Sequence, residues 1–332
     1  MSIKTPYLLF LGNAADPLAA KVAQGIRDWR PENCVGQLRL EGCNADLGLT
    51  DMTPNEAAAQ GAKSLVVGVA NRGGVIDSSW VEALIEAMES GLDLAAGLHN
   101  KLADIPELAE AAKRLGRQIH DVRHPTRSYP VASGTARCGK RLLAVGTDCS
   151  CGKMYTTLAI EKELRQRGVN ADFRATGQTG ILITGDGVSI DAVAADFISG
   201  SVEFHAPENT EDHWDIIEGQ GSLYHASFAG VSLGLLHGSQ ADALVLCHEP
   251  TRTHMRGLPD FPLPSIKECM EANLRAASLT NKDARFVGIA INTSNLSDDE
   301  AMAYLSKIEQ EFDLPTVDPV RTGVARIVDN LL

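Results

Sequence analysis

Short apolar runs alternate with amphipathic stretches along the first 125 residues. The runs predict buried strands at residues 7–12, 64–69, 92–97 and 117–122. Between them, the segment 78–91 repeats apolar residues at helical spacing, and the segment 105–116 has a proline near its start and a glycine at its end. Alternating strands and helices predict a parallel sheet with helices on both faces. We therefore expect a Rossmann-like domain over residues 1–130.

The same alternation returns in the second half of the chain. Further strands are predicted at residues 142–146, 170–176, 213–219, 241–249 and 284–294, with helical patterns between most of them. The segment 124–141 contains two prolines and several small polar residues without periodicity, which favours a domain boundary there. The fold class is thus α/β, with two parallel-sheet domains: Rossmann-like over 1–130 and, because its first strand runs into the phosphate-loop pattern GTDCSCGK, P-loop NTPase-like over 131–332.

Composition and net charge limit the partners and the cellular location that we expect for the protein. A chain of 332 residues suits two domains, and its net charge of −13 argues against nucleic acid or an anionic membrane as a partner. The apolar run of Tyr7–Leu11 is too short for a signal peptide or a membrane span. Seven scattered cysteines favour reduced thiols. We expect a cytoplasmic protein and, from base rates, a homodimer.

The segment GTDCSCGKMY at 146–155 predicts a phosphate-binding loop, because an apolar strand precedes it and a helical pattern follows it. It departs from the nucleotide-binding pattern at two positions. Gly146 comes one residue too early, and Met154 replaces the Ser or Thr whose hydroxyl binds magnesium. Cys149 and Cys151 form a C-x-C pair without a second pair, so no metal site is predicted.

Polar segments follow the other predicted strands of the second half, and the carboxyl ends of parallel strands share one edge of a sheet. The segment after 241–249 combines histidines, which can move protons near pH 7, with arginines, which bind carboxylates or phosphates. In the first half, the turn GVANRGGVI at 68–76 does not have the spacing of a dinucleotide-binding fingerprint. A site is therefore expected in the second domain.

These motifs resemble those of known families. The segments GTDCSCGK and EGQGS are similar to the loops of dethiobiotin synthetase, a P-loop enzyme. A narrower resemblance covers nearly the whole chain, through SLVVGVANRGG, ATGQTGI, GDGVSIDAVAADFISG, IEGQGSL and CHEPTR. It is to a family with a Rossmann-like domain followed by a P-loop domain, long labelled as of unknown function and now associated with D-glutamate N-acetyltransferase.

The resemblance implies an acyltransferase that moves an acetyl group from acetyl-CoA, its co-substrate, to the amine of D-glutamate. Magnesium is then not expected, because a phosphate cradle holds CoA without phosphoryl transfer. The residues expected to bind the phosphate groups are Thr147, Ser150, Cys151, Gly152 and Lys153. Those expected to bind D-glutamate are Arg252, Arg256, Gln178 and Thr179.

The general base is left open among the ionisable residues of these loops. The candidate catalytic residues are Glu218, His248, His254 and Asp148. Cys149 or Cys151 is an alternative if the acetyl group passes through a thioester on the enzyme. A magnesium-ATP-dependent ligase or kinase of the dethiobiotin synthetase type is the rival function, and a non-catalytic nucleotide-binding regulator is the third. The rival enzyme requires Asp148, Glu218 and Thr156 or Thr157 to recruit magnesium.

Overall fold

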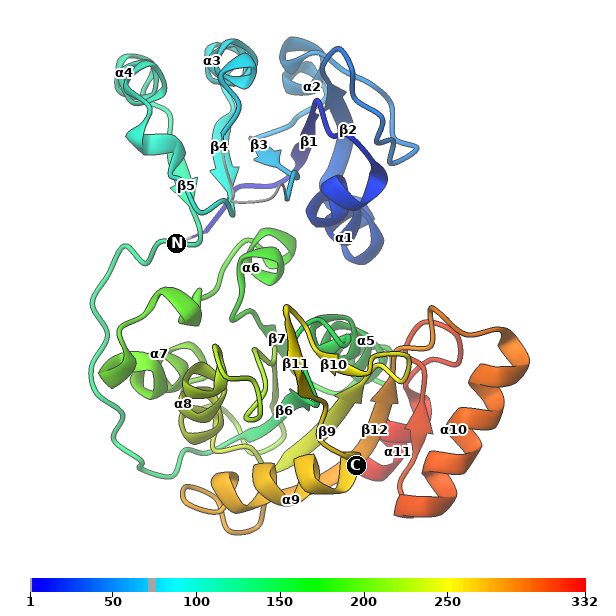
Figure 1. Ribbon diagram of the computed structural model, residues 1–332. Coiled ribbons are helices and arrows are strands. Elements are labelled where there is room, and N and C mark those ends of the chain that lie inside the picture. The colour runs from blue at the N-terminus through cyan, green and yellow to red at the C-terminus, as the bar shows by residue number, and fades with distance from the viewer. Residues whose placement is uncertain (1, 71–75) are drawn as a thin grey trace. The chain divides into compact units, whose positions relative to one another are not determined.

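A computed structural model describes residues 2–70 and 76–332 of the chain (Figure 1). The contacts divide it into two compact units. The first comprises Met1–Thr126 together with Gly177–Ala192, and the second comprises Arg127–Thr176 together with Val193–Leu332. A segment of the second half therefore packs with the first unit. The turn discussed at 68–76 lies largely outside the described residues.

The first unit is built on a parallel sheet of five strands. Its order is β2-β1-β3-β4-β5, and the strands are β1 (Tyr7–Gly12), β2 (Cys34–Arg39), β3 (Ser64–Val67), β4 (Asp93–Ala96) and β5 (Ile119–Asp121). The helices are α1 (Lys21–Trp29), α2 (Pro54–Ala59), α3 (Val81–Glu89), α4 (Pro106–Leu115) and α6 (Gln178–Thr184). Helix α4 begins at a proline and ends at Gly116, whose φ is 63°, as predicted.

The second unit contains a parallel sheet of six strands in the order β13-β12-β9-β6-β8-β7. They are β6 (Lys140–Gly146), β7 (Ala171–Arg174), β8 (Trp214–Ile217), β9 (Ala243–His248), β12 (Arg285–Ile291) and β13 (Thr316–Val317). A two-stranded antiparallel hairpin, β10 (His254–Met255) and β11 (Leu258–Pro262), follows β9. The central strands are buried on both faces, as in other parallel sheets covered by helices.

Helices cover both faces of the six-stranded sheet. Helices α5 (Lys153–Gln166) and α11 (Ala325–Leu331) pack together on one face, and α8 (Ala229–Ser239) and α9 (Ile266–Ala277) pack on the other (Figure 1). The remaining helices are α7 (Ile198–His205) and α10 (Asp298–Phe312). Strand β6 lies between β9 and β8, so the loop that leaves β6 starts at the point where such sheets bind ligands.

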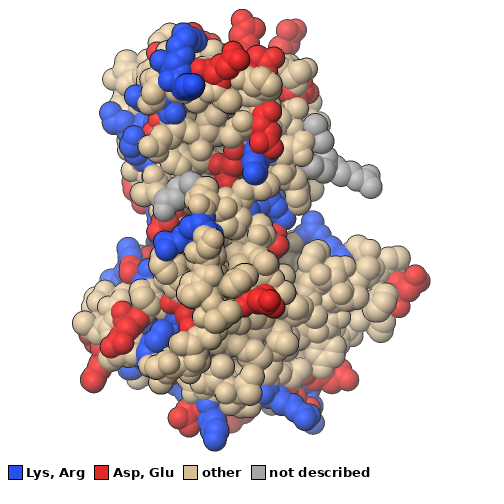
Figure 2. Space-filling view, turned by 90° about the vertical axis from the view of Figure 1, so that its left-hand side faces the viewer, with Lys and Arg blue, Asp and Glu red and all other residues tan. Residues whose placement is uncertain are grey.

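The predicted fold class is confirmed, and two local predictions are wrong. The segment after β7 was expected to be a polar loop, but its residues from Gln178 onward form α6. The segment after β9 was also expected to be a loop, and it contains the β10–β11 hairpin. None of the described helices is long and apolar enough to cross a membrane. On the face drawn in Figure 2, acidic and basic side chains of the described residues are interspersed.

Candidate functional site

The loop after β6 has the backbone form of an anion cradle. Strand β6 ends at Gly146 and α5 begins at Lys153, and between them Ser150 and Gly152 have positive φ angles of 51° and 110°. Among the residues that the structure describes, the N–H groups of Ser150, Cys151, Gly152 and Lys153 have no hydrogen-bond acceptor. Unpaired amides at the positive end of a helix dipole bind phosphate groups.

Lys153 adds a full positive charge beneath this cradle. Its side chain is buried, and Nζ donates a hydrogen bond of 2.7 Å to the carbonyl oxygen of Asp148. The strand-end segment EGQG packs against it. A Cβ atom added at Gly219 would lie 2.9 Å from Cδ of Lys153 and 1.7 Å from the carbonyl oxygen of Ala144. The first glycine of EGQG is therefore required by the close approach of β8 to β6 and to the lysine.

The hydroxyl groups of the first turn of α5 are used by the helix itself. Thr156 Oγ1 donates to the carbonyl oxygen of Gly152 at 3.0 Å, and Thr157 Oγ1 donates to that of Lys153 at 2.9 Å. Met154 occupies the position of the magnesium-binding hydroxyl. Each hydroxyl donates its proton in these hydrogen bonds and keeps its oxygen lone pairs, so these contacts do not decide between the two functions.

Asp148 joins the loop to the segment after β9. Its carboxylate is buried, and Oδ1 accepts a hydrogen bond of 2.7 Å from the N–H of Cys149. Oδ2 accepts hydrogen bonds from Nη1 of Arg252 at 2.8 Å and from the N–H of Arg256 at 2.9 Å. Three donors on one carboxylate favour a structural role for Asp148 over the catalytic role expected from the sequence.

The two arginines of this segment differ in how many of their guanidinium nitrogens already contact acceptors within the protein. Arg252 also donates from Nη1 to the carbonyl oxygen of Cys149 and from Nη2 to that of Ser150, and Nε pairs with Glu249. Arg256 is exposed, and its guanidinium donates to the hydroxyl of Ser150. Of the two, Arg256 is better placed to bind a carboxylate of a ligand.

The two candidate histidines lie in different surroundings. His248 ends β9, and its Nδ1 lies 2.9 Å from Oγ1 of Thr147 in the loop. Burial lowers the pKa of His248 to about 4, so the ring is neutral at pH 7 and only weakly basic. His254 is exposed on β10, with Nδ1 3.0 Å from the carbonyl oxygen of Met255.

The carboxyl ends of the neighbouring strands contact one another, as the sequence predicts. Glu218, directly after β8, is buried, and its Oε2 accepts a hydrogen bond of 2.9 Å from the N–H of Thr176 after β7. Ser222 Oγ donates to the carbonyl oxygen of Thr147 at 3.2 Å, which joins the segments after β8 and β6. Glu218 thus lies in the same strand-end cluster as the phosphate-binding loop, beside Gly219.

Gln178 and Thr179 are placed with the first unit. They begin α6, which packs against α1. A Cβ atom added at Gly97, just after β4, would lie 2.9 Å from Cβ of Gln178. The Cβ atom of Gln178 therefore lies against the end of β4. Gln178 and Thr179 belong to the first unit, whereas the other predicted site residues belong to the second.

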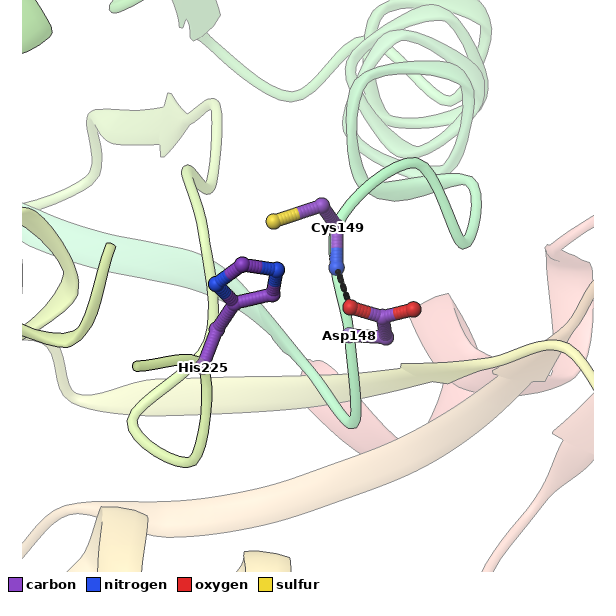
Figure 3. A group of neighbouring side chains, drawn as sticks. All are labelled: Asp148, Cys149 and His225. Atoms are coloured by element: carbon purple, nitrogen blue, oxygen red, sulfur yellow. Dashed lines mark hydrogen bonds between the residues drawn. The ribbon is translucent and has the colours of Figure 1, made fainter. Parts of the chain in front are cut away.

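Asp148, Cys149 and His225 form a cluster of possible metal ligands (Figure 3), with ligand atoms within 4.8 Å of one another. Both ring nitrogens of His225 are already used, because Nδ1 accepts from the N–H of Ser227 at 3.2 Å and Nε2 lies 3.1 Å from the carbonyl oxygen of Arg256. Burial raises the pKa of the Cys149 thiol, which disfavours the thiolate that a metal binds. The cluster therefore does not fit a resident metal ion.

Two family models match the chain. The model described as "Domain of unknown function (DUF1611_N) Rossmann-like domain" matches residues 38–125. The model described as "Domain of unknown function (DUF1611_C) P-loop domain" matches residues 130–328, which is more than half of the chain. The chain belongs to the DUF1611 family.

Relatives of this DUF1611 chain match it over nearly its whole length. A protein of Tritonibacter scottomollicae named D-glutamate N-acetyltransferase is 60% identical over 329 residues, 99% of each chain. A protein of Pseudoalteromonas sp. with the same name is 52% identical over 331 residues, 100% of each chain. The crystal structure of a DUF1611 family protein from Anabaena variabilis is 31% identical, covers 99% of both chains and has a TM-score of 0.84. The family resemblance drawn from the sequence is confirmed.

Two residues of this DUF1611 site are not among those predicted from the sequence. His225 was not singled out, although it lies in the polar segment after β8, and the structure brings its ring beside Asp148 and Cys149 (Figure 3). Glu249, in the charged segment after β9, has no predicted role, and its Oε2 lies 2.9 Å from Nε of Arg252. The polar strand-end position was the signal available for both residues.

Proposed function

We propose that this chain is a D-glutamate N-acetyltransferase, which transfers the acetyl group of acetyl-CoA to the amine of D-glutamate and releases N-acetyl-D-glutamate and CoA. The observation that carries the proposal is the identity of 60% and 52%, over essentially the whole chain, to two proteins of that name. We further expect a cytoplasmic homodimer, and sedimentation of the purified protein tests the dimer.

The phosphate-binding loop binds a phosphate group of acetyl-CoA in this proposal. CoA carries a pyrophosphate and a 3′-phosphate, and either suits a cradle of unpaired amides with a lysine beneath it. In this assignment the N–H groups of residues 150–153 and Nζ of Lys153 hold one of these groups, beside the hydroxyl of Thr147. Because no phosphoryl group moves, the absence of a hydroxyl at Met154 does not impair the reaction.

Glu218 is the base that fits the reaction best among the four candidates. The amine of D-glutamate is protonated at pH 7 and must lose a proton before it attacks the thioester. Asp148 is held by three donors, His248 is weakly basic because burial lowers its pKa to about 4, and His254 is exposed. Glu218 is a buried carboxylate next to Gly219, which packs against the side chain of Lys153.

The reaction then proceeds by direct transfer. The deprotonated amine attacks the carbonyl carbon of the thioester, and backbone amides of the strand-end segments stabilise the tetrahedral oxyanion. Collapse of this intermediate breaks the C–S bond and expels the CoA thiolate, which takes up a proton. Arg256 binds one carboxylate of D-glutamate.

The test is CoA thiol release with D- and L-glutamate, in the absence of magnesium and ATP. We expect release with D-glutamate and little with L-glutamate, and Glu218→Gln should abolish it while CoA still binds. Arg275→Gln, at an exposed position on α9, serves as the control variant. If neither enantiomer gives thiol release and ADP forms when magnesium-ATP is supplied, the result would contradict the acetyltransferase and favour the rival function, a ligase or kinase.

A further inference from the structure

Arg252 reaches from the segment after β9 to the phosphate-binding loop. Its Nη1 donates to the carbonyl oxygen of Cys149 at 2.5 Å and to Oδ2 of Asp148 at 2.8 Å, and Nη2 donates to the carbonyl oxygen of Ser150 at 2.8 Å. Nε lies 2.9 Å from Oε2 of Glu249. All three guanidinium nitrogens therefore already contact acceptors within the protein.

These contacts fix the direction of two amides of the cradle. In a planar trans peptide, the C=O group and the following N–H group point in opposite directions. The carbonyl of Cys149 shares a peptide with the N–H of Ser150, and the carbonyl of Ser150 shares one with the N–H of Cys151. By holding both carbonyls, Arg252 turns both N–H groups away from itself. Neither group has an acceptor among the described residues.

The backbone of Ser150 also needs support from its surroundings. Its φ of 51° lies in the left-handed region, which residues other than glycine adopt at an energetic cost and only where the structure around them enforces it. Arg252 binds the carbonyl before Ser150 and the carbonyl of Ser150 itself. It therefore holds both peptides that flank the strained residue.

We infer that Arg252 is a positioning residue that shapes the cradle for the phosphate groups of acetyl-CoA and does not bind D-glutamate. The inference rests on the proposed function for the identity of the ligand. The charges agree with it, because the guanidinium lies between two buried carboxylates, Asp148 and Glu249. Lys153, at the start of α5, and the exposed Arg256 are the two cations to which the proposed function assigns ligand binding.

The first test is calorimetric titration of CoA into the full chain without D-glutamate. Arg252→Lys keeps the charge between the two carboxylates, but a lysine lacks the planar fork and cannot hold both carbonyls in the same way. We expect the Kd for CoA to rise at least about tenfold in Arg252→Lys and to stay within about twofold in the exposed control Arg275→Gln. Circular dichroism and thermal melting verify that both variants are folded.

Steady-state kinetics distinguish a positioning role from direct substrate binding. In Arg252→Lys, we expect the KM for acetyl-CoA to rise while the KM for D-glutamate stays within about twofold. Ethylguanidinium should restore CoA binding to Arg252→Ala, because it supplies the missing fork. An unchanged Kd for CoA, or a rise confined to the KM for D-glutamate, would overturn the inference. A wild-type protein that binds no CoA would overturn the proposed donor as well, and that failure appears before any variant is compared.

Discussion

Gly219→Ala tests whether the close approach of β8 to the phosphate-binding loop is as tight as the structure has it. The added Cβ would lie 1.7 Å from the carbonyl oxygen of Ala144 and 2.9 Å from Cδ of Lys153. The first contact is to backbone in the central strand β6, which a change of rotamer cannot relieve. The end of β8 must therefore move away from β6. This movement displaces Glu218 and disrupts the packing of Gly219 against Lys153.

The expected magnitude follows from the size of this clash. Overpacking a buried site costs about 1–3 kcal/mol, and a contact this short to fixed backbone belongs at the upper end. A loss of about 3 kcal/mol corresponds to a fall in Tm of roughly 6–12 °C for a unit of 150–250 residues. Because Lys153 is displaced too, CoA binding should weaken in any folded fraction.

Gly230→Ala is the matched control, measured by scanning calorimetry and CoA titration alongside it. Gly230 lies in α8, and nothing lies within 4 Å of a Cβ atom added there. Alanine is the better helix former, so this variant should be unchanged or more stable by up to about 1 kcal/mol. If the two variants melt together near the wild-type temperature, the close packing at Gly219 is refuted.

Three further predictions follow from the charges and thiols of the site. Lys153→Met should weaken CoA binding by about 1.5–3 kcal/mol, or roughly 10- to 150-fold in Kd by titration, and an unchanged Kd would contradict the cradle. The pKa of His248 is lowered to about 4 from about 6.5, so the unfolded chain takes up a proton first as the pH falls. Urea unfolding should therefore show a loss of about 2–3 kcal/mol between pH 7 and pH 4.5 that His248→Gln lacks, and an equal loss in both proteins would speak against a neutral, partly buried ring. Cys149→Ser should keep kcat within about threefold, because burial raises the pKa of the thiol and disfavours an acetyl-thioester on the enzyme; an acetylated Cys149 detected by mass spectrometry would disprove direct transfer.

The architecture was largely readable from the sequence because local patterns determine it. Continuous apolar runs identify strands buried on both faces. The strand-end rule then brought Thr147, His248 and Glu218 into one cluster without any knowledge of the function.

The roles of individual side chains were not readable in this way. The loop residues that Arg252 binds lie about a hundred positions earlier in the chain, and the residue type shows only that a carboxylate or carbonyl will be bound, not which one. Gln178 follows a strand of the second unit, yet it begins α6, which packs with the first unit. The local sequence does not show this, because the contacts of α6 with α1 and of Gln178 with the end of β4 are long-range. His248 shows the same limit, since its lowered pKa depends on burial.

A crystal structure of the protein with CoA and D-glutamate tests the central claim most directly. The account predicts a phosphate group of CoA on the N–H groups of residues 150–153, with Nζ of Lys153 in contact and Arg252 still on the carbonyls of Cys149 and Ser150. CoA bound elsewhere, with the loop free of its phosphate groups, would contradict it.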